Sequence, residues 1–223
     1  MIHVPAAPVG GAGRLVAALR ARGLELTDQV APEPGIGATL LLTTPVDWLQ
    51  LGMWLAHWHV ARSCRLLVLS RVGAHPDAVA PGLRDLWRLE EHARVSLIPT
   101  LVLRLAPLVA ADSPFWLRLR HARLGPEGRA VVMPVMEEDA LQGLESALKE
   151  SNGGWEGWFE VTGPEARTVA EWAEVAARRG NATSEAWEPD VEELLEHKLS
   201  EPLLWQRRFG VTARSVTSWA AEK

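Results

Sequence analysis

Few residues in this sequence have the types and spacing that chemistry requires. His57 and His59 lie two positions apart on a predicted helix, so their side chains point to different faces and cannot easily share a metal ion. A basic run follows Phe115 and Trp116 and could bind an anion, although a solvated helix face explains it more simply; it comprises Arg118, Arg120, His121 and Arg123. We find no zinc-ligand spacing, phosphate-binding loop or nucleophile elbow. No metal is therefore predicted.

Ser70 is a hydroxyl at the end of a strand-length apolar run, RLLVLS (65–70). A single strand-end hydroxyl carries out proton-transfer chemistry only together with a second side chain. The chain contains no tyrosine, and its lysines are only Lys149, Lys198 and Lys223. Ser70 on its own is therefore expected to have a structural role, and we predict no catalytic residue.

Strand-like runs alternate with helical patterns along the chain. Strands are predicted over 2–4, 24–26, 38–44, 65–70, 100–105 and 158–163, and helices over 47–63, 83–95, 137–149, 168–180, 189–199 and 213–221, with a further helix ending at Gly23. Thr168 and Glu171 form a capping-box pattern. Buried strands separated by helices predict an α/β fold, a Rossmann-like doubly wound parallel sheet. We expect a core over 1–150 and a small C-terminal α/β lobe over 151–223.

Five segments in this order and spacing resemble the short-chain dehydrogenase/reductase superfamily, nearest its atypical, extended NmrA-like branch. They are VPAAPVGGAGRLVAALRARG (4–23), RLLVLSRVGA (65–74), LEEHARVSLIPTLVLRLAPLV (89–109), VMPVMEEDALQGLESAL (132–148) and GWFEVTGPEARTVAEWAEVAARRG (157–180). The resemblance implies a dinucleotide-binding fold, with Ser70 matching the family's serine and Arg104 a strand arginine. Together with Arg118 and Arg120, Arg104 is a candidate anion site over the carboxyl ends of the strands.

The departures from the family pattern concern catalysis. The family's chemistry implies a Tyr, and a Lys four residues later, on the helix after the serine strand. Those positions fall on Gly82 and Leu86, or on Leu83 and Trp87, and residues 1–148 contain neither Tyr nor Lys. A degenerate, non-catalytic relative is therefore predicted, one that shows no hydride transfer on carbonyl or sugar-nucleotide substrates.

The glycine turn that the family uses for a dinucleotide is incomplete. One register keeps Gly10 and Gly13 of three expected glycines, which would let the backbone approach a pyrophosphate at the helix N-terminus. The alternative is a turn that merely needs positive φ. Only the loop 27–37 stands where the family has a further helix and strand, and Asp28 is a poorly placed partner for a ribose hydroxyl. We expect weak or no NAD(P) binding and no cofactor.

The predicted helix 47–63, DWLQLGMWLAHWHVARS, carries more apolar surface than one buried face requires. Trp54 and Trp58 are one turn apart, with Leu51 and Leu55 beside them. Because a monomer rarely exposes such a set, we predict that these four residues contact a protein partner. The expected contact is a homodimer through helices 47–63 and 83–95, and burial against the chain's own sheet is the alternative.

Composition bounds the partners. The net charge of −5 argues against general binding to nucleic acid or to an anionic membrane, and the longest apolar stretch, 97–111, is too short to span a bilayer. Cys64 is the only cysteine, and with no signal-peptide pattern it suggests the cytoplasm. The leading hypothesis is a regulator that acts through protein–protein interaction. The alternatives are an NAD(P)H-dependent reductase or isomerase with a rearranged site, and a small-ligand sensor.

Overall fold

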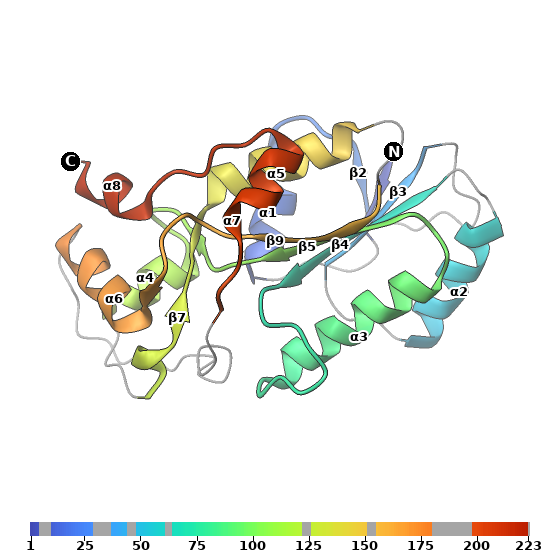
Figure 1. Cartoon of the computed structure of the whole chain (residues 1–223). Helices are drawn as coiled ribbons and strands as arrows, with labels where there is room; N and C mark the ends of the chain where they lie inside the picture. Colours follow the sequence, from blue (N-terminus) through green and yellow to red (C-terminus); the bar gives the residue numbers. More distant parts are fainter. Residues whose placement is uncertain are drawn as a thin grey trace.

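The computed structural model describes residues 1–4, 10–28, 37–43, 48–60, 64–121, 126–150, 155–179 and 198–222. Its centre is a six-stranded sheet in the order β2-β1-β3-β4-β5-β9, and all neighbouring strands are parallel (Figure 1). The strands are β1 (Ile2–His3), β2 (Leu26–Thr27), β3 (Thr39–Leu42), β4 (Arg65–Arg71), β5 (Thr100–Leu105) and β9 (Gly157–Val161). This is the doubly wound α/β fold that the sequence predicts.

Helices cover both faces of the sheet, which is why its strands are apolar on both sides. One face packs against α1 (Gly10–Ala21), α5 (Glu137–Lys149) and α7 (Pro202–Phe209), and the other against α2 (Trp48–Val60) and α3 (Pro81–Val95). Successive residues of β4 alternate between the two faces: Leu67 and Leu69 join the first hydrophobic cluster, whereas Leu66 and Val68 join the second. Two separate cores therefore hold the sheet in place.

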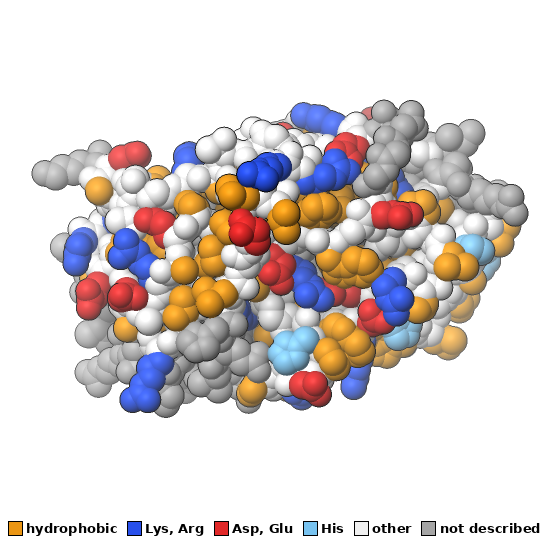
Figure 2. Space-filling model, viewed as in Figure 1, with side chains coloured by type: hydrophobic (Ala, Val, Ile, Leu, Met, Phe, Trp, Pro, Cys, Tyr) orange, Lys and Arg blue, Asp and Glu red, His pale blue; other side chains and the backbone are white. Residues whose placement is uncertain are grey.

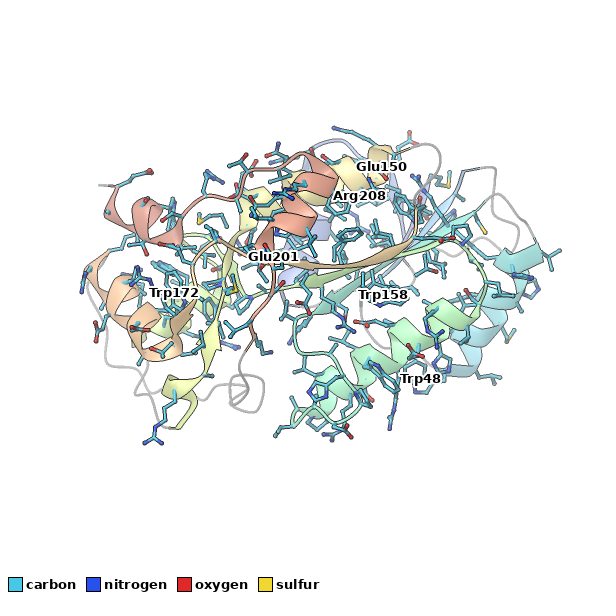
Figure 3. All side chains as sticks on the ribbon, viewed as in Figure 1. Trp48, Glu150, Trp158, Trp172, Glu201 and Arg208 are labelled. Atoms are coloured by element: carbon cyan, nitrogen blue, oxygen red, sulfur yellow. The ribbon has the colours of Figure 1, made fainter. Side chains whose placement is uncertain are left out.

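A lobe with its own core lies beside the carboxyl ends of the strands, on the left in Figure 1. It contains β6 (Leu108–Val109), α4 (Pro114–His121), the 3₁₀ turn Pro126–Arg129, β7 (Val131–Val132), β8 (Val135–Met136), β10 (Arg167–Thr168), α6 (Val169–Arg178) and α8 (Val216–Ala221). Trp172, labelled in Figure 3, fills the centre and donates its ring N–H to the carbonyl of Val132. The predicted capping box of Thr168 and Glu171 is present and starts α6.

The expected division at residue 150 does not match the structure. β9 belongs to the core sheet, and α7 packs on the core through Trp205 and Phe209. Residues 108–121 and 126–136, in contrast, belong mostly to the lobe, where they pair with β10 and pack on α6. The chain thus enters the lobe, returns to the core for α5 and β9, and enters the lobe again for β10 and α6. It then returns to the core with α7 and ends in the lobe with α8. This path depends on long-range strand pairing, which local sequence patterns do not report.

Most predicted elements are present with shifted ends. The helix expected over 137–149 is found with those bounds as α5, whereas α7 has no counterpart in our predictions. The predicted acidic helix 189–199 falls mainly outside the described residues, as do Asp47 and most of the loop 27–37. No helix among the described ranges is long and apolar enough to cross a membrane.

Candidate functional site at the carboxyl edge of the sheet

The order in which the chain adds strands to the sheet reverses between β1 and β3. From β1 the chain adds β2 on one side, and then β3, β4, β5 and β9 on the other. In open parallel sheets, ligands bind outside the carboxyl ends of the strands at such a switch point. The arrow of β4 in Figure 1 points toward the lobe, so the lobe stands next to this edge. A ligand at this edge would lie between the core and the lobe.

Three buried hydroxyls lie at or just beyond the ends of these strands. Thr43 follows β3 directly, Ser70 is near the end of β4, and Thr162 follows β9. All three are almost completely buried, and their hydroxyl oxygens have no hydrogen-bond partner in the structure. A buried hydroxyl without a partner costs about 1–3 kcal/mol, so such groups call for an explanation. Their gathering at one edge of the sheet is the main evidence for a site.

Helix α1 begins at this same edge. It starts at Gly10, shortly after β1 in the sequence, so its free backbone N–H groups face the region beyond the strand ends. Gly13 lies inside the helix, and residues 5–9 fall outside the described ranges. At Gly11 an added Cβ atom would lie 3.2 Å from the side chain of Leu108. Close packing on the lobe therefore explains the glycine at position 11, while Gly10 is placed at the helix start as a phosphate contact requires.

Arg14 joins this helix to both α5 and the lobe. Its Nε lies 2.6 Å from Glu137 Oε2 and its Nη2 lies 2.8 Å from Asp112 Oδ1. Hydrogen bonds to Glu137, and then to Asp112, raise the pKa of Arg14, and the guanidinium in turn lowers the pKa of the Asp112 carboxyl. The charge of Arg14 is therefore already balanced, and its role is to hold α1 against its neighbours.

Asp28 lies just beyond β2. In dinucleotide-binding folds, a carboxylate near this strand end accepts a hydrogen bond from a ribose hydroxyl. Its carboxylate is exposed and accepts a hydrogen bond from Arg20. The ion pair is solvent-exposed, and such pairs contribute little to stability, so a ligand could displace Arg20 at small cost. Whether Asp28 takes part in ligand binding stays a prediction.

The anion site expected from Arg104, Arg118 and Arg120 is not assembled. Arg104 of β5 points to the α3 face, where its Nη2 lies 2.6 Å from Oε2 of the buried Glu90. Burial alone would lower the pKa of Arg104, but hydrogen bonding to Glu90 and the charge of that carboxylate outweigh it and raise the pKa. Arg118 is exposed and Arg120 half-buried on α4, in the lobe. The prediction is corrected because Arg104 is neutralised inside the core.

The predicted interface residues of α2 mostly face the chain's own sheet. Leu51, Leu55 and Trp58 are buried in the second hydrophobic cluster, and Trp54 is partly buried against it. The ring of Trp58 meets that of His3 edge to face at 5.3 Å. Leu51, Leu55 and Trp58 are therefore not available to a partner, contrary to the prediction, and Trp54 is the only one of the four that keeps an exposed part. The large apolar side chains that α2 exposes are Leu49, Met53 and Val60.

Lys198 comes to the same edge from the far end of the chain. It is buried, and its backbone N–H donates to the carbonyl of Val131 in the lobe. Its side chain reaches the turn after β4: a Cβ atom built on Gly73 would lie 3.5 Å from both Lys198 Cε and Nζ. Sequence reasoning missed this residue, because nothing in its local sequence predicts an approach to Gly73.

A cavity of about 480 Å³ lies between α1, α5 and the lobe. Its arginines already have partners: Arg22 with Glu138 and Glu145, Arg214 with Asp139, and Arg179 with the ring and carbonyl of Trp219. Figure 2 likewise shows acidic and basic side chains interspersed on the visible face. Within the described residues no group of three or more His, Cys, Asp or Glu side chains gathers as for a metal ion. The switch-point edge is thus the stronger candidate.

No protein-family model matches this sequence, and no curated protein matches it. Solved structures match over nearly the whole chain. MoeE5 in complex with UDP-glucose and NAD has a TM-score of 0.70 at 14% identity, covering 99% of this chain and 96% of that chain. A nucleoside-diphosphate-sugar epimerase from Staphylococcus aureus has a TM-score of 0.68 at 10% identity, with 99% of each chain covered. TunA, an NAD-dependent NDP-hexosamine 5,6-dehydratase, reaches 0.65 at 13% identity, covering 100% and 98%.

Identities this low show the fold alone. The Rossmann-like α/β fold is confirmed, whereas nothing in these matches points to the NmrA-like branch. The expectation of no cofactor is contradicted, because structures with this fold hold or depend on NAD. That expectation weighed the missing glycine too heavily, since a helix N-terminus and strand-end hydroxyls can also face a dinucleotide.

Proposed function

We propose that this protein binds a nicotinamide dinucleotide at the carboxyl edge of its sheet and uses it in a reductase- or isomerase-type reaction on a small polar substrate. The observation that carries the proposal is the set of unpartnered buried hydroxyls of Thr43, Ser70 and Thr162 at that edge. The NAD-containing structures of the same fold support it. When bound, the nicotinamide ring supplies hydride transfer.

The described residues fit such a ligand in outline. The N-terminus of α1, opening at Gly10, would face the diphosphate, because free N–H groups and the helix dipole favour an anion there. Thr43 stands at the switch point itself and would hydrogen-bond the cofactor. Ser70 lies one strand further along and would orient a substrate oxygen. Each contact would give a partner to a hydroxyl that now has none.

The test replaces Thr43 by valine, which keeps the side-chain shape and removes the hydroxyl. NADH titrated by calorimetry should bind the wild-type protein saturably, and Thr43→Val should weaken binding by about twofold to tenfold, the value of one hydrogen bond. The free energy of unfolding should not fall, because the lost hydroxyl has no partner in the unliganded protein.

Thr100→Val is the matched control. Thr100 is also buried, but it lies at the opposite end of β5, and its hydroxyl donates to the carbonyl of Ile98 at 2.7 Å. This variant should lose about 1 kcal/mol of stability and leave NADH binding unchanged. A wild-type protein that binds neither NADH nor NADPH would refute the proposed function.

The lack of tyrosine favours a second candidate, a protein that binds the dinucleotide and acts on a protein partner without turnover. Residues 1–148 carry neither Tyr nor Lys, so the usual proton-transfer pair is absent. NADH consumption with a panel of aldehydes and ketones separates the two candidates: turnover above background supports the enzyme. Binding without turnover, together with ligand-dependent association, supports the regulator.

A further inference from the structure

Lys198 joins the lobe to the reactive end of the candidate site. Its backbone pairs with β7, through the bond to Val131 and a parallel bridge to Val132. Its amino group lies against Gly73 of the core, in the turn that directly follows Ser70 and β4. The segment then continues into α7, whose Trp205 donates its ring N–H to the carbonyl of Thr162 at 2.9 Å. The backbone of Lys198 is thus fixed on the lobe, and its amine lies against the core at the carboxyl edge of the sheet.

The turn at Gly73 accommodates this approach. Gly73 has a φ of 94°, which side chains rarely adopt, and the turn is closed by the N–H of Ala74 donating to the carbonyl of Arg71 at 3.0 Å. The absent side chain leaves the space that Lys198 Cε and Nζ approach. Glycine at position 73 therefore allows the backbone conformation of the turn and leaves room for the amine of Lys198.

The described side chains at this edge differ in the protons that they can donate. Thr43, Ser70 and Thr162 are neutral hydroxyls, and Arg104 is neutralised by Glu90. His75, in the same turn, uses its Nδ1 to accept from the backbone N–H of Asp77 at 3.2 Å. The side chain of Lys198 ends in an amino group which, as an ammonium, carries three N–H donors. Among the described residues, Lys198 can therefore supply what the hydroxyls cannot.

We propose that the ammonium group of Lys198 lies beside the nicotinamide end of the bound dinucleotide and is the proton donor of the reaction. The inference rests on the proposed function. In reduction, a hydride passes from the dihydronicotinamide to the carbonyl carbon, the carbonyl π bond breaks, and its oxygen takes a proton from Lys198. The products are an alcohol, the oxidised dinucleotide and a neutral amine, which regains a proton from water. Ser70 orients the same oxygen.

The position at the nicotinamide end follows from the switch point. A dinucleotide crosses the crevice with its diphosphate at the start of α1 and its adenosine half on the β2 side. The other half then extends over β3 and β4, whose end carries Ser70 and the Gly73 turn. The oxidised nicotinamide ring is positively charged and the reduced ring is neutral. A neighbouring cation must therefore disfavour the oxidised form, which gives a test that needs no substrate.

The experiment compares the affinities of NAD⁺ and NADH for the full-length protein by calorimetry. Lys198→Met removes the charge and should strengthen NAD⁺ binding relative to NADH by about tenfold, as expected for one unit charge at roughly 10 Å in a partly buried site. Lys198→Arg keeps the charge and should leave the ratio near that of the wild type. Lys149→Met, at an exposed position near the end of α5, is the control and should also leave it unchanged.

A purely structural lysine would change both affinities together and leave their ratio constant, which would overturn the inference while the proposed function stands. A wild-type protein that binds neither form would overturn the proposed function itself. If Lys198→Met does not fold by circular dichroism, Lys198→Gln keeps hydrogen bonding without charge and gives the same readout. For any carbonyl compound that the wild type reduces, Lys198→Gln should lower the rate about a hundredfold or more at unchanged NADH affinity.

Discussion

At the scale of single residues, Gly163 shows why the TGPE segment has its sequence. The residue lies just beyond β9, where the core strand meets the lobe, and its N–H donates to the carbonyl of Met133 at 3.2 Å. A Cβ atom built there would lie 2.1 Å from the carbonyl oxygen of Pro134. Because that neighbour is backbone, it cannot rotate away as a side chain could. Only glycine lets β9 and the lobe approach so closely.

We predict that Gly163→Ala lowers the free energy of unfolding by about 2–4 kcal/mol, since the strand end or the lobe must shift. Urea denaturation followed by tryptophan fluorescence measures the change. Gly52→Ala is the control, because Gly52 lies in α2 with open space around it, and there alanine should stabilise by about 0.5–1 kcal/mol. If Gly163→Ala were as stable as the wild type, Gly163 would not lie as close to the carbonyl of Pro134 as the structure shows.

At the scale of elements, α2 packs one of its faces on the sheet. Trp58 is completely buried, and its carbonyl accepts the thiol hydrogen of Cys64. Burial raises the pKa of that thiol, so Cys64 is expected to react slowly. The opposite face exposes Leu49, Met53 and Val60. The homodimer through α2 and α3 stays a prediction. Any such contact would have to use Leu49, Met53 and Val60.

Substitutions on the two faces of α2 should therefore behave differently. Trp58→Ala should lower the free energy of unfolding by about 3–5 kcal/mol, because it leaves a large cavity in the core. Met53→Ala should change it by less than about 0.5 kcal/mol. Thermal and urea denaturation measure both. A mild effect of Trp58→Ala would place its ring outside the core, contrary to the structure.

Light scattering then tests the dimer. If α2 forms its contact, Met53→Glu should give folded monomer where the wild type is a dimer, because a charge would be desolvated at the interface. A wild-type monomer at high concentration would end the homodimer prediction through this helix.

At the scale of the whole molecule, the C-terminal third completes the core. The ring N–H of Trp155 donates to the carbonyl of Leu66 at 2.7 Å, and Trp205 packs on Gly143 of α5. Arg208 of α7 forms an ion pair with Glu150 at the end of α5, as Figure 3 shows. The first hydrophobic cluster thus draws residues from β1 to the segment after α7.

A fragment of residues 1–150 should consequently not fold on its own. It lacks β9, Trp155 and α7, so β5 would become an unpaired edge and one face of the sheet would lose part of its cover. Circular dichroism during urea titration should show no cooperative transition for the fragment and a clear one for the full chain. Cooperative unfolding of the fragment would support the boundary at 150 that the sequence suggested.

The sequence by itself determined the α/β class, the parallel sheet, most helices and the capping box of Thr168, because these depend on local periodicity and short-range hydrogen bonds. It also showed that the usual Tyr–Lys pair is missing. It did not determine which face of α2 is buried, since the helix carries apolar residues on all of its faces. Nor could it show that Arg104 is paired with Glu90.

Only the tertiary structure decided the site. Thr43, Ser70 and Thr162 are ordinary residues in sequence, and what marks them is that burial leaves their hydroxyls without partners. Lys198 is distant in sequence from Gly73 and reaches it because the lobe folds back over the carboxyl edge of the sheet. Such contacts arise from the packing of whole elements, and that packing is set by long-range pairing rather than by local pattern.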